Sequence, residues 1–130
     1  MSKFPIQQLI TIVFDSDHRS NYTFKAPKGL IYLLKSITYL TKSENNDGYV
    51  WIYNSGMKES GVIRERDVIS FFRTSITRGN FQQFFDNFKT KYIHIEPYSA
   101  FAGIIYVVIE VELVKCSKHD AIFEYLEKDY

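Results

Sequence analysis

The alternating run at residues 104–114 constrains the fold of this chain more than any other segment. Every second position in it carries a branched aliphatic side chain: Ile105, Val107, Ile109, Val111 and Leu113. The positions between them include Tyr106, Glu110 and Glu112. Because successive side chains of a β-strand point to opposite faces, the run predicts a strand whose aliphatic face is buried.

Other segments repeat this signal. We expect strands at residues 6–14, 22–26, 30–41, 49–53 and 92–96, which are rich in β-branched and aromatic side chains. The alternation of the long segment shifts around Lys35 and Ser36. A β-bulge at this point would restore the register.

Two groups of turn-forming residues separate these strands. Pro27, Lys28 and Gly29 combine one residue of fixed φ with one of free φ, which predicts a tight turn. The run at residues 45–48, Asn-Asn-Asp-Gly, tolerates the positive φ angles of hairpin turns. It predicts a hairpin, with residues 49–53 as the returning strand.

Two segments carry helix signals. Asn80 and Gln83 are spaced as in a capping box, and the phenylalanines after Asn80 fall at i, i+3, i+4 and i+7: Phe81, Phe84, Phe85 and Phe88. They predict a short amphipathic helix that covers one end of the β core. A second capping pattern begins at Ser117 and predicts a helix at residues 118–128. Residues 57–78 fit a strand or a helix equally well.

Length and composition indicate one globular domain. The chain has 130 residues, of which 45% are hydrophobic and 24% charged, as in typical globular proteins. We therefore expect a mainly β chain, a single β-sandwich of jelly-roll or Greek-key type over residues 1–130. A short helix insertion and a helical tail at residues 117–130 complete it. The alternative is an α+β sheet with helices on one face.

Charge and hydropathy argue against several classes of protein, although nucleic-acid binding is only unsupported and not excluded. A net charge of +1 offers no broad basic surface for nucleic acid. The longest apolar run is about half of the roughly 20 residues that a membrane-spanning helix needs. The N-terminal residues lack the apolar stretch of a signal peptide. The lone Cys116 excludes an internal disulfide, and we expect a buried or inert thiol.

Two sets of residues are candidates for binding. Tyr49, Trp51 and Tyr53 share one face of their strand, opposite Val50 and Ile52. Either this aromatic face packs into the core, or it binds a sugar or a protein. The segment 57–78 holds four arginines, Arg64, Arg66, Arg73 and Arg78. They form either a surface for anions or partners, or a solvated edge beside acidic neighbours.

Catalytic and metal-binding patterns are weak throughout. The histidines His18, His94 and His119 lack a short metal-ligand spacing. Residues 15–18 are rich in oxygen ligands but lack the later Gly and Glu of a calcium loop, so we expect a polar turn. Cys116 and His119 lack a third catalytic group, and Glu110 and Glu112 fit the solvent face of a strand. We expect no catalytic residue, metal, cofactor or enzymatic activity.

A family resemblance suggests what such a protein does. The segments 22–29 and 34–37, an aromatic strand and the final run 103–114 resemble small jelly-roll virion structural proteins of bacteriophages. These include head decoration, penton and collar or fibre-base modules. The resemblance covers the layout of residues 6–114, although residues 57–90 depart from the compact pattern, and it brings no catalytic residues.

The resemblance implies a structural component of a virus or phage particle, assembled in the host cytoplasm. Such a protein acts by self-association into a homo-oligomer and by contact with other virion proteins. The alternative is a carbohydrate-binding module that uses Tyr49, Trp51 and Tyr53. An enzyme whose site is assembled only by the fold is a third possibility.

Overall fold

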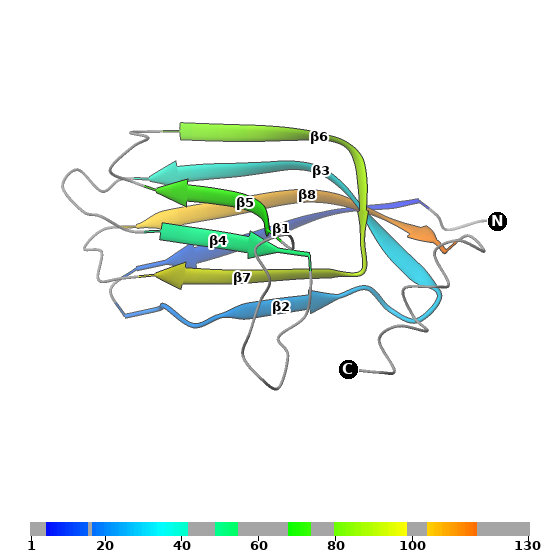
Figure 1. Cartoon of the computed structure of the whole chain (residues 1–130), viewed down its shortest axis with the longest axis horizontal. Coiled ribbons are helices and arrows are strands. Elements are labelled where there is room, and N and C mark those ends of the chain that lie inside the picture. The colour runs from blue at the N-terminus through cyan, green and yellow to red at the C-terminus, as the bar shows by residue number, and fades with distance from the viewer. Residues whose placement is uncertain are drawn as a thin grey trace.

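The computed structural model describes residues 5–15, 17–41, 49–54, 68–73, 80–98 and 104–116. Within these ranges the chain forms eight strands and no helix (Figure 1). The strands are β1 (Ile6–Phe14), β2 (Tyr22–Lys25), β3 (Leu30–Thr41), β4 (Tyr49–Tyr53), β5 (Val68–Arg73), β6 (Asn80–Thr90), β7 (Tyr92–Tyr98) and β8 (Ile105–Lys115).

The described strands form two antiparallel sheets of four strands, which lie one over the other (Figure 1). Sheet A has the order β1-β8-β3-β6, and sheet B has the order β2-β7-β4-β5. Except for β4 and β5, strands that are consecutive along the chain belong to different sheets. The expected mainly β sandwich is therefore confirmed.

The sequence pattern located most strands closely. The observed bounds of β1, β3 and β4 coincide with the predicted ones, and β2, β7 and β8 differ by one or two residues at an end. The predicted irregularity in β3 is also confirmed, because the register against both neighbouring strands shifts between Leu34 and Ser36. Lys35 is the bulged residue.

The core lies between the two sheets, and β8 contributes its whole aliphatic face to it. Ile105, Val107, Ile109 and Val111 are fully buried. Aliphatic and aromatic side chains of both sheets pack with them: Ile12, Phe14, Ala26, Tyr32, Leu34, Ile37, Tyr39, Val50, Ile52, Phe72, Ile93, Ile95 and Leu113. Burial of so many apolar groups is the main source of stability of this fold.

The helix predicted after Asn80 is wrong, because residues 80–90 form strand β6 at the edge of sheet A. Phe81 pairs with Tyr39, and Phe84 with Ser36. Between Phe84 and Phe88 the register slips against β3, and Asn87 takes a positive φ of 52°. A bulged strand changes its alternation at the bulge, so the phenylalanine spacing imitated a helical stripe.

The hairpin predicted at residues 45–48 is also wrong. The turn residues lie outside the described ranges, but the flanking strands settle the pairing. β3 belongs to sheet A, whereas β4 belongs to sheet B and pairs with β5 and β7. Of residues 57–78, Val68–Arg73 is a strand. The predicted C-terminal helix at residues 118–128 lies outside the described residues.

A polar network joins the sheets where β5 and β6 lie at their edges. The ring of Tyr39 on β3 stacks on Phe72 of β5, with centroids 4.6 Å apart. Its hydroxyl lies 2.6 Å from Ser70 Oγ, which donates to Gln83 Oε1 of β6 at 2.9 Å. Burial raises the pKa of the Tyr39 hydroxyl, and its bond to Ser70 opposes this effect.

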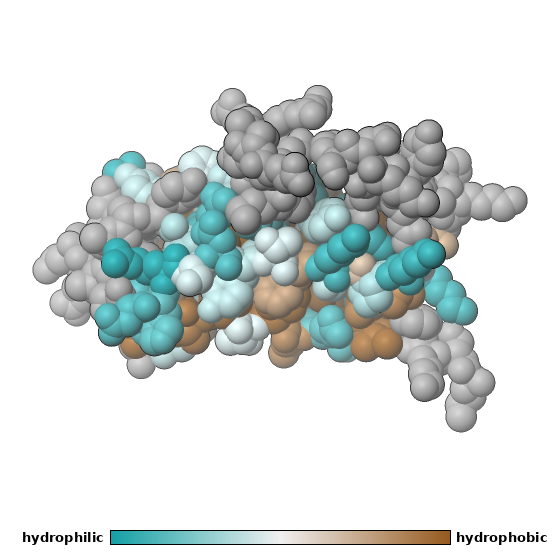
Figure 2. All heavy atoms as spheres, turned by 90° about the horizontal axis from the view of Figure 1, so that it is seen from below, coloured by the Kyte–Doolittle hydropathy of each residue, from teal (hydrophilic) through white to brown (hydrophobic). Residues whose placement is uncertain are grey.

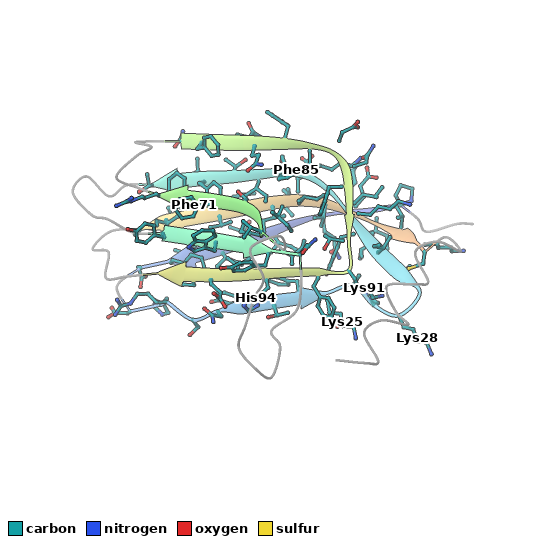
Figure 3. All side chains as sticks on the ribbon, viewed as in Figure 1. Lys25, Lys28, Phe71, Phe85, Lys91 and His94 are labelled. Atoms are coloured by element: carbon teal, nitrogen blue, oxygen red, sulfur yellow. The ribbon has the colours of Figure 1, made fainter. Side chains whose placement is uncertain are left out.

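A buried lysine joins the β2–β3 turn to the β6–β7 connection. Lys91 is 4% exposed, and its amine donates to the carbonyl oxygens of Pro27 and Leu30 at 3.0 and 2.8 Å. Its own carbonyl accepts from the amide of Ala26. Gly29 provides the positive φ of 81° that this turn requires. The predicted tight turn is confirmed, and Figure 3 shows Lys91 near Lys25 and Lys28.

The Tyr39 network yields a stability prediction. Tyr39→Phe keeps the ring stack but leaves Ser70 without its buried hydroxyl partner, which should lower the free energy of unfolding by about 1–2 kcal/mol. Urea denaturation monitored by circular dichroism measures it. Tyr22→Phe, at a partly exposed tyrosine, is the matched control. Equal loss in both variants would contradict the assigned role.

Tyr39→Phe should also change how the stability of the protein depends on pH. A tyrosine whose folded pKa lies above its ordinary value of 10.0 contributes stability that is lost as pH rises above that value. The stability of the wild-type protein should therefore fall more steeply above pH 10.0 than that of Tyr39→Phe.

Candidate functional site

The outer face of sheet B carries the aromatic residues singled out in the sequence. On β4, Val50 and Ile52 are fully buried in the core, so Tyr49, Trp51 and Tyr53 point away from sheet A. The interpretation that this aromatic face packs into the core is therefore wrong. The aliphatic face does so, and Val50 and Ile52 pack there with side chains of both sheets.

A fourth aromatic residue completes this face. Trp51 pairs across the strands with Phe71 of β5, and the ring centroids lie 4.3 Å apart. Tyr49 also stacks on Phe71 at 5.9 Å, and Trp51 lies nearly parallel to Tyr53 at 6.2 Å. We call Tyr49, Trp51, Tyr53 and Phe71 the aromatic surface. Sequence alone did not single out Phe71, because its place depends on the register of β4 against β5 (Figure 3).

Exposure varies across the aromatic surface. Phe71 is 37% exposed, whereas Tyr53 is 8% exposed. Tyr49 and Trp51 are half-buried. Only part of each ring is therefore available to a partner, mainly on the side of β5.

One of the four arginines proposed as contacts for anions or partners lies at this surface. Arg73 on β5 lies opposite Tyr49, and its guanidinium carbon is 4.9 Å from the centre of the Tyr49 ring. This is a cation–π arrangement, in which the ring face attracts the positive charge. The other arginines, Arg64, Arg66 and Arg78, lie outside the described residues.

A buried histidine adjoins the aromatic surface. His94 of β7 is fully buried, and its Nδ1 and Nε2 lie 2.6 Å from Thr23 Oγ1 and 2.8 Å from Glu96 Oε1 (Figure 3). A neutral imidazole with its proton on Nε2 would donate to Glu96 and accept from Thr23. The ring of Tyr53 lies 6.1 Å from that of His94. The network ties β2 to β7 beneath the aromatic side chains.

The series hydroxyl, imidazole and carboxylate has the order found in catalytic triads. In a triad the imidazole is bonded on both nitrogens in the same way, by the hydroxyl and by the carboxylate. Here Thr23 and Glu96 contact both nitrogens of the fully buried His94. We interpret the network as a support for sheet B, because it joins the paired strands β2 and β7 through a buried side chain. Its assembly required the register of β2 against β7, which no sequence motif indicates.

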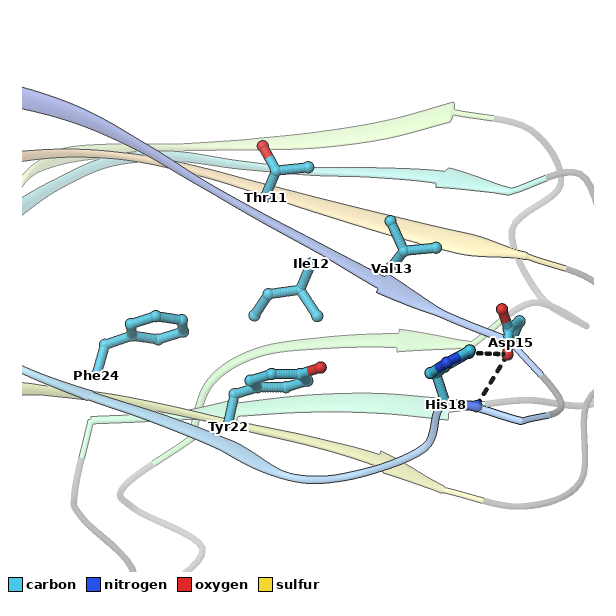
Figure 4. A pocket seen from close by; sticks show the side chains of 7 residues that line it. All are labelled: Thr11, Ile12, Val13, Asp15, His18, Tyr22 and Phe24. Atoms are coloured by element: carbon cyan, nitrogen blue, oxygen red, sulfur yellow. Dashed lines mark hydrogen bonds and ion pairs between the residues drawn. The ribbon is translucent and has the colours of Figure 1, made fainter.

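A groove opens at the other edge of the sandwich, between β1 and β2 (Figure 4). It has a volume of about 440 Å³ and is lined by Thr11, Ile12, Val13, Asp15, His18, Tyr22 and Phe24. The ring of Tyr22 lies 5.9 Å from that of the core residue Phe14. Figure 2 shows the molecule from below. Hydrophobic residues gather along the middle and lower part of this face.

The turn after β1 is held by its own side chains. Asp15 Oδ1 accepts from the backbone amides of Asp17 and His18, both at 2.8 Å, and lies 2.8 Å from His18 Nδ1. The contact with the His18 side chain, followed by these amides, lowers the pKa of the Asp15 carboxyl. The described residues contain no group of three or more side chains that could hold a metal ion. The Asp15 Oδ1 atom is therefore bonded to groups of its own turn.

The outer face of sheet A is mixed. Leu9 of β1 and Phe84 of β6 are 69% and 74% exposed, and Val13 is partly exposed. Glu110 and Glu112 of β8 lie on the same face, and Glu112 forms an ion pair with Lys35 of β3 at 3.6 Å. These two carboxylates occupy the solvent face of an amphipathic strand, as the alternation predicted. Cys116 is half-buried, and its backbone amide donates to Gly29 O. His119 lies outside the described residues.

Comparison with known proteins adds no relative. No protein-family model matches this chain, and no curated protein is significantly similar to it. Within the described residues, no helix has the length and apolar character needed to cross a membrane.

The His94 network can be tested by two substitutions at one position. Glu96→Ala removes the acceptor of a buried imidazole and should lower the free energy of unfolding by about 1–3 kcal/mol. Glu96→Gln keeps an amide oxygen that can accept from Nε2 and should cost less. Chemical denaturation of both variants gives the comparison. Equal losses would show that the bond to His94 contributes little.

Proposed function

We propose that this chain is a non-enzymatic structural subunit of a virus or phage particle, with a jelly-roll fold. The strand order supports the fold. Eight strands in two four-stranded sheets, which alternate between the sheets except for β4 and β5, with β1 beside β8 and β2 beside β7, correspond to the double Greek key of jelly rolls. Jelly rolls occur in viral capsid proteins and in lectins, so the choice between these functions depends on the surfaces.

The observation that carries the proposal is the exposed apolar part of sheet A. Leu9 and Phe84 each leave more than two thirds of their surface uncovered, although they are large apolar side chains on rigid strands. Single exposed apolar residues are common on protein surfaces, so the support comes from several of them on one face: Leu9, Val13 and Phe84 all point away from the core. In a particle, another copy of this chain or a neighbouring virion subunit would cover them. Leu9 and Phe84 lie on the two edge strands of sheet A, in one row with Glu110 and Ser36 between them, so such a contact would span the sheet and include these polar groups.

The assembly proposal makes a prediction about mass in solution. The purified wild-type chain should be a homo-oligomer by size-exclusion chromatography with light scattering. The double variant Leu9→Glu, Phe84→Glu should elute as a monomer, because charges at a buried interface are costly. Both positions are exposed, so circular dichroism should stay unchanged. Gln7→Glu, on the same face of β1, is the control. A wild-type monomer at all concentrations would contradict the proposal.

A second candidate function rests on the aromatic surface. Aromatic rings present a flat apolar face, and sugar rings stack on such faces through their C–H groups. Phe71 is the exposed member of this surface and stacks with the half-buried Trp51. Arg73 and Glu96 lie close by as polar groups that could bind sugar hydroxyls. This arrangement supports a carbohydrate-binding module, as an alternative to the virion subunit.

Glycan-array binding separates the two functions. If the aromatic surface binds a sugar, Phe71→Ala and Trp51→Ala should each weaken binding at least about tenfold, the effect of losing about 1.4 kcal/mol. Tyr22→Ala, in the β1–β2 groove, should leave binding unchanged. Circular dichroism must confirm that Trp51→Ala still folds. A glycan-binding strict monomer would favour the carbohydrate function, and an oligomer without glycan binding would favour the virion function.

A further inference from the structure

Three side chains of complementary chemistry meet on the outer face of sheet A. They come from three adjacent strands: Lys35 from β3, Asn87 from β6 and Glu112 from β8. The amine of Lys35 donates a hydrogen bond to Asn87 Oδ1. The same amine lies 3.6 Å from Glu112 Oε2. An amine, a carboxamide and a carboxylate thus share one point of the sheet.

The backbone of both strands is irregular where the amine meets the amide. Leu34 pairs with Val111 of β8 and Ser36 with Glu110, so Lys35 has no register partner on β8. On β6 the partners of the same two residues are Phe88 and Phe84, so Asn87 also lies within a break of the register. Asn87 has a positive φ of 52°, a left-handed conformation that asparagine adopts more readily than most residues other than glycine. Two bulges therefore place the amine against the amide.

The Lys35–Glu112 pair is partly buried, whereas Asn87 is exposed. The side chains of Lys35 and Glu112 are 28% and 19% exposed. Charges that are partly removed from water interact more strongly than exposed ones. A lysine amine becomes a nucleophile when a neighbouring base accepts its proton.

We propose that Lys35, Asn87 and Glu112 are a self-processing site that joins the two strands by an amide bond between Lys35 Nζ and Asn87 Cγ. Glu112 accepts a proton from the Lys35 ammonium, and the neutral amine attacks Asn87 Cγ. The bond from Cγ to Nδ2 then breaks. Glu112 returns the proton to Nδ2, which leaves as ammonia. Glu112 then takes the extra proton from the attacking nitrogen, so that a neutral amide remains, and this proton leaves with the ammonia as ammonium. One amide bond forms as another breaks, so no oxidant, cofactor or energy source is needed.

The cross-link has a mechanical consequence. It joins residues that are 52 positions apart, so it closes a long loop in the unfolded chain. A bond across such a loop stabilises a fold by restricting its unfolded state. It also ties the edge strand β6 covalently to β3 in the interior of sheet A. This inference does not depend on the proposed assembly, since it concerns one copy of the chain.

Intact mass spectrometry of the full-length chain under denaturing conditions tests the proposal. The wild-type protein should weigh one ammonia less than its sequence. A tryptic digest should contain a branched peptide that joins the segments around Lys35 and Asn87, uncut after Lys35. Loss of ammonia by cyclisation of an asparagine elsewhere gives no branched peptide. That result, or the full sequence mass in folded wild-type protein, would overturn the proposal.

Variants assign the role of each residue. Lys35→Arg keeps the positive charge beside Glu112 but lacks a nucleophilic amine, and Asn87→Ala lacks the acyl group. Both should keep the full sequence mass, and their midpoint of thermal unfolding should fall by on the order of 10 °C. Glu112→Gln should also keep the full mass, because it cannot carry the proton. Glu110→Gln, on the same strand face, should cross-link like wild type. Cross-linking that persists in Glu112→Gln would overturn the role of Glu112.

Discussion

The burial of one face of β8 is the constraint on which the rest of this structure depends. β8 lies between β1 and β3 in sheet A, and its aliphatic side chains meet those of sheet B across the core. A strand with Ile105, Val107 and Ile109 on one face and Glu110 and Glu112 on the other tolerates no shift of register, because a shift by one residue would bury the carboxylates. The registers of β1 and β3 follow from it.

Strand positions were largely predictable from the sequence, and strand partners were not. The bulge at Lys35 was visible as a shift of alternation, because it changes which side chains face the core. The segment 80–90 forms a strand although its phenylalanines have the spacing of a helix, because a register break lies between Phe84 and Phe88. The predicted hairpin at residues 45–48 is wrong for another reason. Local turn chemistry specifies a bend, but it does not specify which sheet the next strand joins.

The same holds for the candidate sites: the positions of some residues could be predicted from the sequence, but their partners could not. The alternation of β4 correctly grouped Tyr49, Trp51 and Tyr53, but it did not reveal which face would be buried. That choice depends on the opposite sheet, which fits Val50 and Ile52 into the core. The His94 network and the cluster around Lys35 were invisible for a simple reason. Their members are far apart in sequence and meet only through pairing between strands.

The alternation of strands between the two sheets also determines when this protein can fold. β1 and β3 do not pair with each other, and each pairs with β8, the last described strand along the chain. During synthesis, the ribosome therefore releases most of the sandwich before its central strand exists. Until then, the apolar faces of β1 and β3 have no common neighbour, and they are exposed to chaperones or to other nascent chains. Folding of sheet A should thus be a late event, concerted with the arrival of β8 rather than progressive from the N-terminus.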